Sequence, residues 1–442
     1  MAYCAFCEYA GFDGAVHTVV SSQNAQYANY SGWDVYRSQV HLVTLLEPKV
    51  GSDIAQSLLN QATQNDGVWD RWTHNTGATH VMEGDPSAPT VAGIVALGGT
   101  DFDVQGAYES LARAATHPTA LDLSDEGCPV MCVGQRPGLD KWLEIHYVPA
   151  EGPAWGGAGE TLEDVTADFS LSQLAAHIGD SAASAQFLER AGYWRNLFNA
   201  DATPEGGYIQ DRNADGTWPE FNAASSRGFA EGSSAQYTWM IPFDANGLFE
   251  VMGGADAAVR RLDAFFTNED GSAALTGLGG LKAEMDNEPS IGAVWMYAFA
   301  SRPDKTQTLV RAVLNTLWST WPDGIPGNDD LGAMSSWYVW AAIGIYPGIP
   351  GRAELLLTSP LFPRVVVRRA NGTTIAIRAS EAGPGKPYVR SLRVNGAQSQ
   401  RSWLPASFVA EGGELSYLLS SEPDAHWGRG GDNVPPSFPP GR

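Results

Sequence analysis

The chain has 442 residues, with 27 Lys and Arg against 50 Asp and Glu, so its net charge is −23. This acidic excess argues against nucleic acid or an anionic membrane as a partner, because binding phosphates requires clustered Lys and Arg. Apolar residues make up 43% of the chain and charged residues only 17%, a composition that supplies a large folded core. The sequence contains no apolar run that could span a bilayer, and no signal peptide is recognisable at its start.

The four cysteines form two close pairs, Cys4 with Cys7 and Cys128 with Cys132. The CxxC spacing of the first pair suits either a zinc site or a disulfide. Nothing else in the sequence supports a zinc ribbon. A disulfide within one pair, or simple packing, is therefore the favoured interpretation.

Helical periodicity dominates residues 34–346. Helices are predicted over 34–46, 53–61, 104–115, 162–178, 181–197, 237–251, 255–267, 292–300, 305–318 and 335–343. No alternation of strands and helices appears, and Gly-, Asn- and Pro-rich loops separate the helices. This pattern predicts a mainly α domain over residues 1–350, with helical hairpins arranged in a ring. An α-solenoid is the alternative, although no repeat of fixed period is present.

The pattern changes after Pro350 to short runs rich in Val, Ile and Leu. Strands are predicted over 354–358, 364–369, 373–378, 388–394 and 414–419. Asn371-Gly372 between two of these runs is typical of a type I′ hairpin turn. We therefore expect a small β domain over residues 351–427, followed by a disordered Gly- and Pro-rich tail over 428–442.

Four loops between the predicted helices carry the polar residues that could perform chemistry. Their sequences are SGWDVYRSQ (31–39), FAEGSSAQYTW (229–239), MDNEPS (285–290) and DGIPGNDDLGAMSSWY (323–338). Taken singly, Asp34, Glu231 and Glu288 could be helix caps or first-turn acids, and residues 328–330 could be turn formers. Together, carboxylates beside Trp and Tyr favour acid–base hydrolysis of a glycosidic bond. Oxygen-rich loops also suit a hard cation, calcium above all.

These four loops, together with RNLFN (195–199) and TSPLF (358–362), resemble glycoside hydrolase family 92. The members of this family are calcium-dependent bacterial exo-α-mannosidases that act with inversion. The resemblance runs from about residue 9 to about residue 413 and implies an (α/α)6-type toroid followed by a small C-terminal β domain. It also implies an N-terminal β-sandwich and a first toroid helix, which are expected to lie outside this sequence.

The resemblance assigns roles to individual residues. Glu231 matches the general acid and Asp330 the general base, while Glu288 matches a position at the calcium and the substrate. Asn328 stands where the family often has a helper Asp, so it can orient water but cannot act as a base. The remaining positions expected to bind the mannose substrate are Trp33, Asp34, Asn287 and Asp329.

The resemblance also implies mannose-containing glycans, such as N-glycans or mannan, as substrates, and a periplasmic or extracellular location. Asn287 replaces a His typical of α-1,2-specific members, which favours α-1,3, α-1,4 or α-1,6 linkages. Glu231 favours an ordinary mannoside over a mannosyl phosphodiester, because members that cleave the phosphodiester have Gln there. A decayed or truncated member that binds mannosides without turnover is the alternative.

Overall fold

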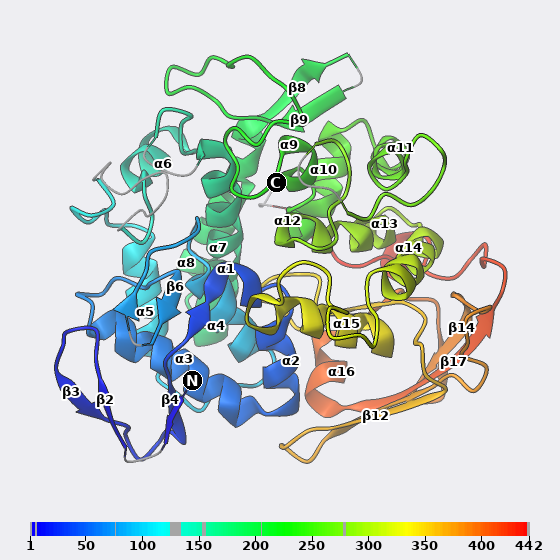
Figure 1. Cartoon of the computed structure of the whole chain (residues 1–442), viewed down its shortest axis with the longest axis horizontal. Helices are drawn as coiled ribbons and strands as arrows, with labels where there is room; N and C mark the ends of the chain where they lie inside the picture. The colour runs from blue at the N-terminus through cyan, green and yellow to red at the C-terminus, as the bar shows by residue number, and fades with distance from the viewer. Residues whose placement is uncertain are drawn as a thin grey trace.

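The computed structural model describes residues 2–4, 7–75, 77–123, 134–152, 156–204, 206–276 and 280–439. Helices are the main regular elements of the first 343 residues (Figure 1). They are α1 (Gly32–Val35), α2 (Gln39–Leu46), α3 (Pro48–Thr63), α4 (Ser87–Ala96), α5 (Val104–Ala114), α6 (Leu139–Ile145), α7 (Gly157–Ile178), α8 (Ser181–Ala191), α9 (Ser234–Tyr237), α10 (Ala245–Val251), α11 (Ala255–Phe265), α12 (Glu288–Ile291), α13 (Met296–Phe299), α14 (Pro303–Thr316) and α15 (Ala333–Ile343). None of the described helices is both long enough and apolar enough to cross a membrane.

The helices follow one another around the molecule, and the last returns to the first, as the colour sequence in Figure 1 shows. Three hydrogen bonds close this ring. Ser38 donates from Oγ to the carbonyl of Ala333 at 2.6 Å, and Trp340 donates from Nε1 to the carbonyl of Ser38 at 3.0 Å. Tyr346 donates to the carbonyl of Arg37 at 3.1 Å. The mainly α toroid predicted from the sequence is therefore confirmed.

The helix predictions differ from the structure in two instructive places. The predicted helix over 34–46 is broken between Val35 and Gln39, so that α1 and α2 are separate. Helix α4 was not predicted, because Pro89 and Gly93 interrupt its apolar pattern. Pro89 lies in the first turn of α4, where a helix does not need the missing N–H group.

Short strands precede the first helix and lie in the loops between later helices. They are β1 (Ala2–Cys4), β2 (Glu8–Ala10), β3 (Val16–Thr18), β4 (Ala25–Tyr27), β5 (Tyr30–Ser31), β6 (Trp72–His74), β7 (Gly77–Ala78), β8 (Phe198–Thr203) and β9 (Gly206–Ile209). Cys4 and Cys7 form a disulfide next to β1, as favoured over zinc. Cys128 and Cys132 lie outside the described residues.

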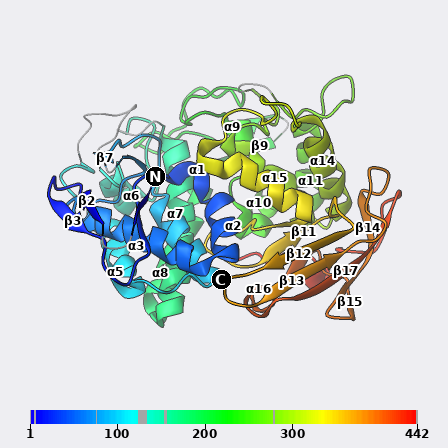
Figure 2. The same ribbon diagram turned by 60° about the horizontal axis from the view of Figure 1, so that its bottom comes forward.

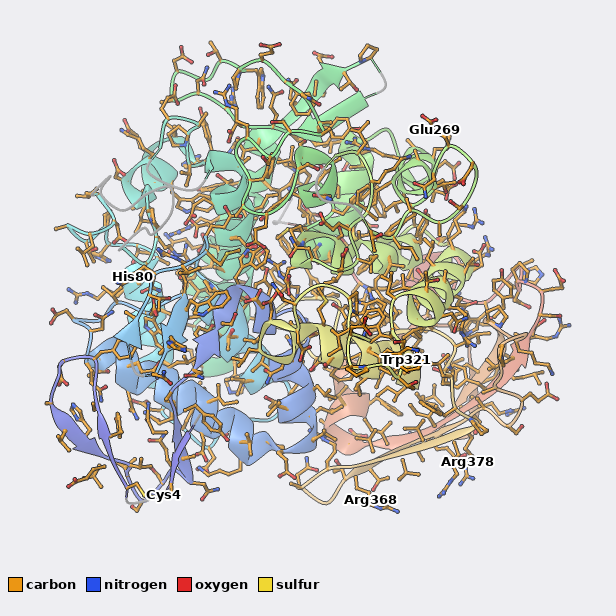
Figure 3. The ribbon with its side chains drawn as sticks, in the orientation of Figure 1. Cys4, His80, Glu269, Trp321, Arg368 and Arg378 are labelled. Atoms are coloured by element: carbon orange, nitrogen blue, oxygen red, sulfur yellow. A yellow bond between two sulfur atoms is a disulfide. The ribbon has the colours of Figure 1, made fainter. Side chains whose placement is uncertain are left out.

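The C-terminal region forms a five-stranded sheet of order β12-β13-β17-β14-β15 beside the helices (Figure 2). Its strands are β12 (Arg364–Arg368), β13 (Thr374–Arg378), β14 (Tyr388–Val394), β15 (Ala397–Ser399) and β17 (Gly413–Ser420), with α16 (Ala406–Glu411) before β17. A smaller sheet joins β10 (Ile345–Tyr346), β11 (Leu355–Leu357) and β16 (Trp403–Leu404), so its pairing crosses the predicted boundary at residue 350. Arg368 and Arg378 point away from the helices (Figure 3).

Two expectations for this region need correction. The hairpin between β12 and β13 forms, but its turn is not type I′. A type I′ turn needs a positive φ at both central residues, and Gly372 has φ +85° whereas Asn371 does not have a positive φ. The tail expected to be disordered is instead packed as far as it is described. Phe438 donates its amide to the carbonyl of Phe243 at 2.7 Å and stands 5.7 Å from the ring of Phe169 in α7.

One buried arginine joins the sheet region to the helices. The side chain of Arg369, directly after β12, donates from Nε to the carbonyl of Leu45 at 2.7 Å and from Nη2 to that of Leu97 at 3.1 Å. It also donates to the carbonyl of Val409 in α16. Leu45 and Leu97 lie at the C-terminal ends of α2 and α4, where helix carbonyls lack partners and carry partial negative charge.

Candidate active site

A pocket of about 960 Å³ opens where the four polar loops converge. Its lining comes from loops widely separated in the sequence. The lining residues are Trp33, Asp34, Trp72, Met82, Ser226, Glu231, Gly232, Glu284, Asp286, Asn287, Gly327, Asn328 and Asp330. The structure thus brings six of the eight residues predicted from the sequence to one pocket wall. Of the other two, Glu288 lies next to Asp34 and Asp330, and Asp329 is not among the lining residues.

Glu231 stands immediately before helix α9. The helix begins there because Ser233 and Gln236 form a capping box. Glu231 itself has a left-handed backbone, with φ +48°. Asn287 donates from Nδ2 to the Glu231 carbonyl at 2.8 Å, which ties the second and third polar loops together. Partial burial and the charge of Asp330 raise the pKa of Glu231, against an opposing hydrogen bond from Asn287.

Asp330 belongs to the fourth loop, which turns sharply into helix α15. Asp330 and Leu331 both have left-handed backbones, with φ of +43° and +55°. Asp329 holds this turn, since its Oδ1 accepts from the amide of Ser335 at 2.8 Å. Burial and the neighbouring Asp329 raise the pKa of Asp330. This contact of Asp329 is typical of a turn-forming residue.

Three carboxylates form a cluster at the inner wall of the pocket. Asp34, Glu288 and Asp330 each present an oxygen within 4.8 Å of the other two. Asp34 and Glu288 are buried, at 2% and 1% exposure. Burial and the charges of Asp330 and Glu231 raise the pKa of Asp34 to about 7, although Ser31 and Arg37 oppose the shift. Burial and the charges of Asp34 and Asp330 likewise raise the pKa of Glu288 well above its usual range.

The chemistry of this cluster fits a hard cation. Neither carboxylate oxygen of Glu288 accepts a hydrogen bond from another described residue, although both are buried. Leaving a buried carboxylate without partners is costly, and a divalent cation would supply the missing interactions. Oxygen ligands in a buried acidic cluster are those that calcium prefers.

Arg37 lies behind the cluster and connects it to the core. Its guanidinium stacks 4.7 Å from the ring centroid of Trp33 and donates to the carbonyl of Trp33 at 2.9 Å. Its Nη2 pairs with Glu163 in helix α7 at 2.7 Å. These contacts fix the orientation of the Trp33–Asp34 loop and place a positive charge near Glu288.

Several lining residues were not predicted from the sequence. Trp72 in β6 and Met82 in the following loop come from a stretch without a recognisable motif. Asp286 stands next to predicted residues, and its Oδ1 is buried without a described partner. The only available signal for Trp72 was an aromatic residue in a polar loop, a feature shared by other tryptophans in the chain.

Comparison with known proteins identifies the family of this chain. A sequence model of the "Glycosyl hydrolase family 92 catalytic domain" matches residues 5–421. An "Uncharacterized secreted glycosidase" of Arthroderma benhamiae is 28% identical over 368 residues, which cover 76% of this chain and 44% of that protein. The chain therefore spans less than half the length of this relative.

Two solved structures from Bacteroides thetaiotaomicron share the fold. The family GH92 α-mannosidase BT3965 is 26% identical with a TM-score of 0.87, covering 99% of this chain and 56% of its own. The family GH92 inverting mannosidase BT2199 is 26% identical with a TM-score of 0.86, covering 99% of this chain and 59% of its own. Because the family match extends over nearly the whole sequence, this chain belongs to glycosyl hydrolase family 92.

Proposed function

We propose that this chain carries the active site of an exo-α-mannosidase, which releases terminal α-linked mannose with inversion of configuration. The observation that carries the proposal is the pocket that presents Glu231 on one loop and Asp330 on another, beside a buried acidic cluster. An inverting glycosidase needs its acid and base carboxyl groups about 6.5–9.5 Å apart, because a water molecule must fit between the base and the sugar, and two different loops can provide such a separation. Similarity to a solved inverting mannosidase supports the same reaction.

Glu231 would act as the general acid, protonating the oxygen of the departing group. Its raised pKa supports this role, because a general acid must stay protonated near neutral pH. Asp330 would act as the general base that removes a proton from the attacking water. Asn328 lines the same pocket and would orient that water without taking its proton.

Glu288 and Asp34 would hold a calcium ion, since both are buried in the acidic cluster. Asp330 is less buried than either, which leaves it accessible to water as a base. When bound, calcium would supply positive charge that binds the mannose 2- and 3-hydroxyl groups and favours ring distortion. Trp33 and Asn287 line the pocket and would contact the same sugar.

The substrate class follows from the same residues. A solved family GH92 α-mannosidase has been captured with mannoimidazole, which supports mannose-containing glycans as substrates here. Asn287 favours linkages other than α-1,2, and Glu231 favours a mannoside over a mannosyl phosphodiester. Similarity to a protein described as secreted supports action outside the cytoplasm.

Mannose release from α-1,2-, α-1,3-, α-1,4- and α-1,6-linked mannobioses, with and without a chelator, tests the proposal. We expect calcium-dependent release, with β-mannose as the first product detected by proton NMR. Glu231→Gln and Asp330→Asn should each lower kcat by at least 10²-fold, the lower range of general acid–base contributions.

A folded chain that binds a mannobiose in a calcium-dependent way without hydrolysing it would contradict the proposal. That result would favour a mannoside-binding protein without turnover. Equal activity in the presence of a chelator would exclude only the proposed role of calcium and would leave the proposed hydrolysis standing. Retention of the anomeric configuration would exclude the assignment of Asp330 as general base.

A further inference from the structure

A further acidic residue, Glu83, lies buried behind the loop that carries the candidate general acid, Glu231. It follows Met82 in the loop before α4 and is 1% exposed. Its Oε1 stands 2.8 Å from the hydroxyl oxygen of Tyr237, in helix α9. The charges that act on it come from Glu160 and Glu163 of helix α7, both of which are carboxylates.

The hydrogen bonds of Tyr237 determine where the proton of this pair lies. The hydroxyl oxygen of Tyr237 is also 2.5 Å from the carbonyl oxygen of Ala230. A carbonyl can only accept, so the single hydroxyl proton of Tyr237 is donated to Ala230. The short contact between Tyr237 and Glu83 then requires a proton from Glu83, which must be a neutral carboxylic acid. Burial and the two neighbouring acids raise the pKa of Glu83 well above its usual range, in agreement with this count.

The Glu83–Tyr237 pair grips the backbone on both sides of Glu231. The carbonyl of Ala230 accepts from the hydroxyl of Tyr237, and the same hydroxyl oxygen contacts Oε1 of Glu83. On the other side, the Tyr237 ring packs so closely against Gly232 that a Cβ there would lie 2.7 Å from Cε2. Glu231 stands between these two contacts with a left-handed φ of +48°, a conformation that other residues must hold in place.

We propose that neutral Glu83 and Tyr237 are positioning residues, which hold the loop of Ala230–Gly232 so that Glu231 faces the pocket. This inference rests on the proposed role of Glu231 as general acid. It assigns to Glu83 the function of a hydrogen-bond donor, for which its negative charge is not required. An amide at this position would reproduce the hydrogen bond to Tyr237.

Glu83→Gln is therefore expected to keep kcat within about 3-fold of the parent chain, because its amide can donate to Tyr237 as the carboxylic acid does. Glu83→Met and Tyr237→Phe each break the arrangement with little change in volume. They should lower kcat by 10-fold to 10²-fold on a mannobiose, whose departing group needs a proton, since misplacement by about 1 Å costs this much. On 2,4-dinitrophenyl α-mannoside, whose leaving group needs no proton, the loss should stay below about 3-fold.

Tyr297→Phe is the matched control. Tyr297 is also buried and its hydroxyl also contacts an acidic side chain, donating to Asp263 at 2.9 Å, but neither residue lines the pocket. It should leave the ratio of the two rates unchanged, and thermal unfolding of every variant reports whether it is folded.

The inference is overturned if Glu83→Gln fails to fold or loses activity as Glu231→Gln does, because either result means that the charge of Glu83 is needed. It is also overturned if Glu83→Met and Tyr237→Phe slow both substrates equally. Should one of these two variants be too unstable to assay, the other decides. Unchanged mannobiose hydrolysis by Glu231→Gln would instead refute the proposed function itself.

Discussion

The backbone at the pocket carries a local cost in free energy. Glu231, Asp330 and Leu331 have φ of +48°, +43° and +55°. Such left-handed conformations cost on the order of 1–3 kcal/mol each in residues other than glycine. The contacts of Asp329 with Ser335 hold the turn at Asp330. The two carboxylates that we assign to catalysis are thus the ones whose placement the surrounding structure must enforce.

Burial of a single histidine makes a prediction for stability against pH. His41 in α2 is 0% exposed, and neither ring nitrogen has a partner among the described residues. Burial lowers its pKa to about 4, whereas in the unfolded chain it titrates near 6.5. As the pH falls, the unfolded state takes up the proton on His41 first. The free energy of unfolding is therefore independent of the titration of this histidine above about pH 6.5, and it declines by about 3 kcal/mol as the pH falls to about 4.

His41→Leu should remove this part of the pH dependence without loss of stability at pH 7.5, since no hydrogen bond is broken. Urea unfolding at pH 7.5 and pH 5 measures the difference. His177→Gln, at an exposed position of α7, is the control and should keep the slope of the parent chain. A His41→Leu protein as sensitive to acid as the parent would contradict the prediction.

At the scale of elements, the turn between β12 and β13 allows a test of backbone conformation. Gly372 has φ +85° and open space around its Cα, so an added methyl group would meet strain without a clash. Gly372→Ala should lower the free energy of unfolding by about 1–2 kcal/mol. Gly385→Ala, also in open space but without a positive φ, should stay within about 0.5 kcal/mol of the parent. Chemical denaturation measures both, and equal effects would show that φ is not the cause.

Which elements the sequence predicts depends on how local their determinants are. Helices α14 and α15 were predicted because their apolar residues repeat at helical spacing. Helix α4 was missed because Pro89 and Gly93 interrupt its apolar pattern, although Pro89 lies in the first turn, where a helix accepts proline. The strands before residue 31 are two or three residues long, too short for an alternating pattern to be recognised.

The residues of the candidate site also differ in whether a local sequence pattern reveals them. Residues in recognisable motifs, such as Glu231 and Asp330, were found from the sequence. Trp72 and Met82 reach the pocket only because the chain folds back, which no local pattern encodes. The contact between Glu83 and Tyr237 joins positions 154 residues apart, so it also required the structure.

At the scale of the whole molecule, the last described residues stabilise the helices. Phe438 packs on Phe169, and the guanidinium carbon of Arg352 lies 4.4 Å from the ring centroid of Phe438. Phe438→Ala should therefore lower the free energy of unfolding by about 1–3 kcal/mol, less than for a fully buried phenylalanine. Phe362→Ala, at a position that is 48% exposed, is the control and should have a smaller effect. Equal losses in thermal unfolding would contradict this packing role.

The reach of Arg369 into the ends of two helices has a consequence for how the molecule comes apart. If the sheet region separated first, the guanidinium of Arg369 and the carbonyls of Leu45 and Leu97 would lose one another as partners together. A half-open intermediate is therefore poorly populated, and heating should melt both regions in one calorimetric peak. For the same reason, a chain nicked between the two regions should stay associated. Removal of the C-terminal sheet should therefore destabilise the helices that carry the candidate site.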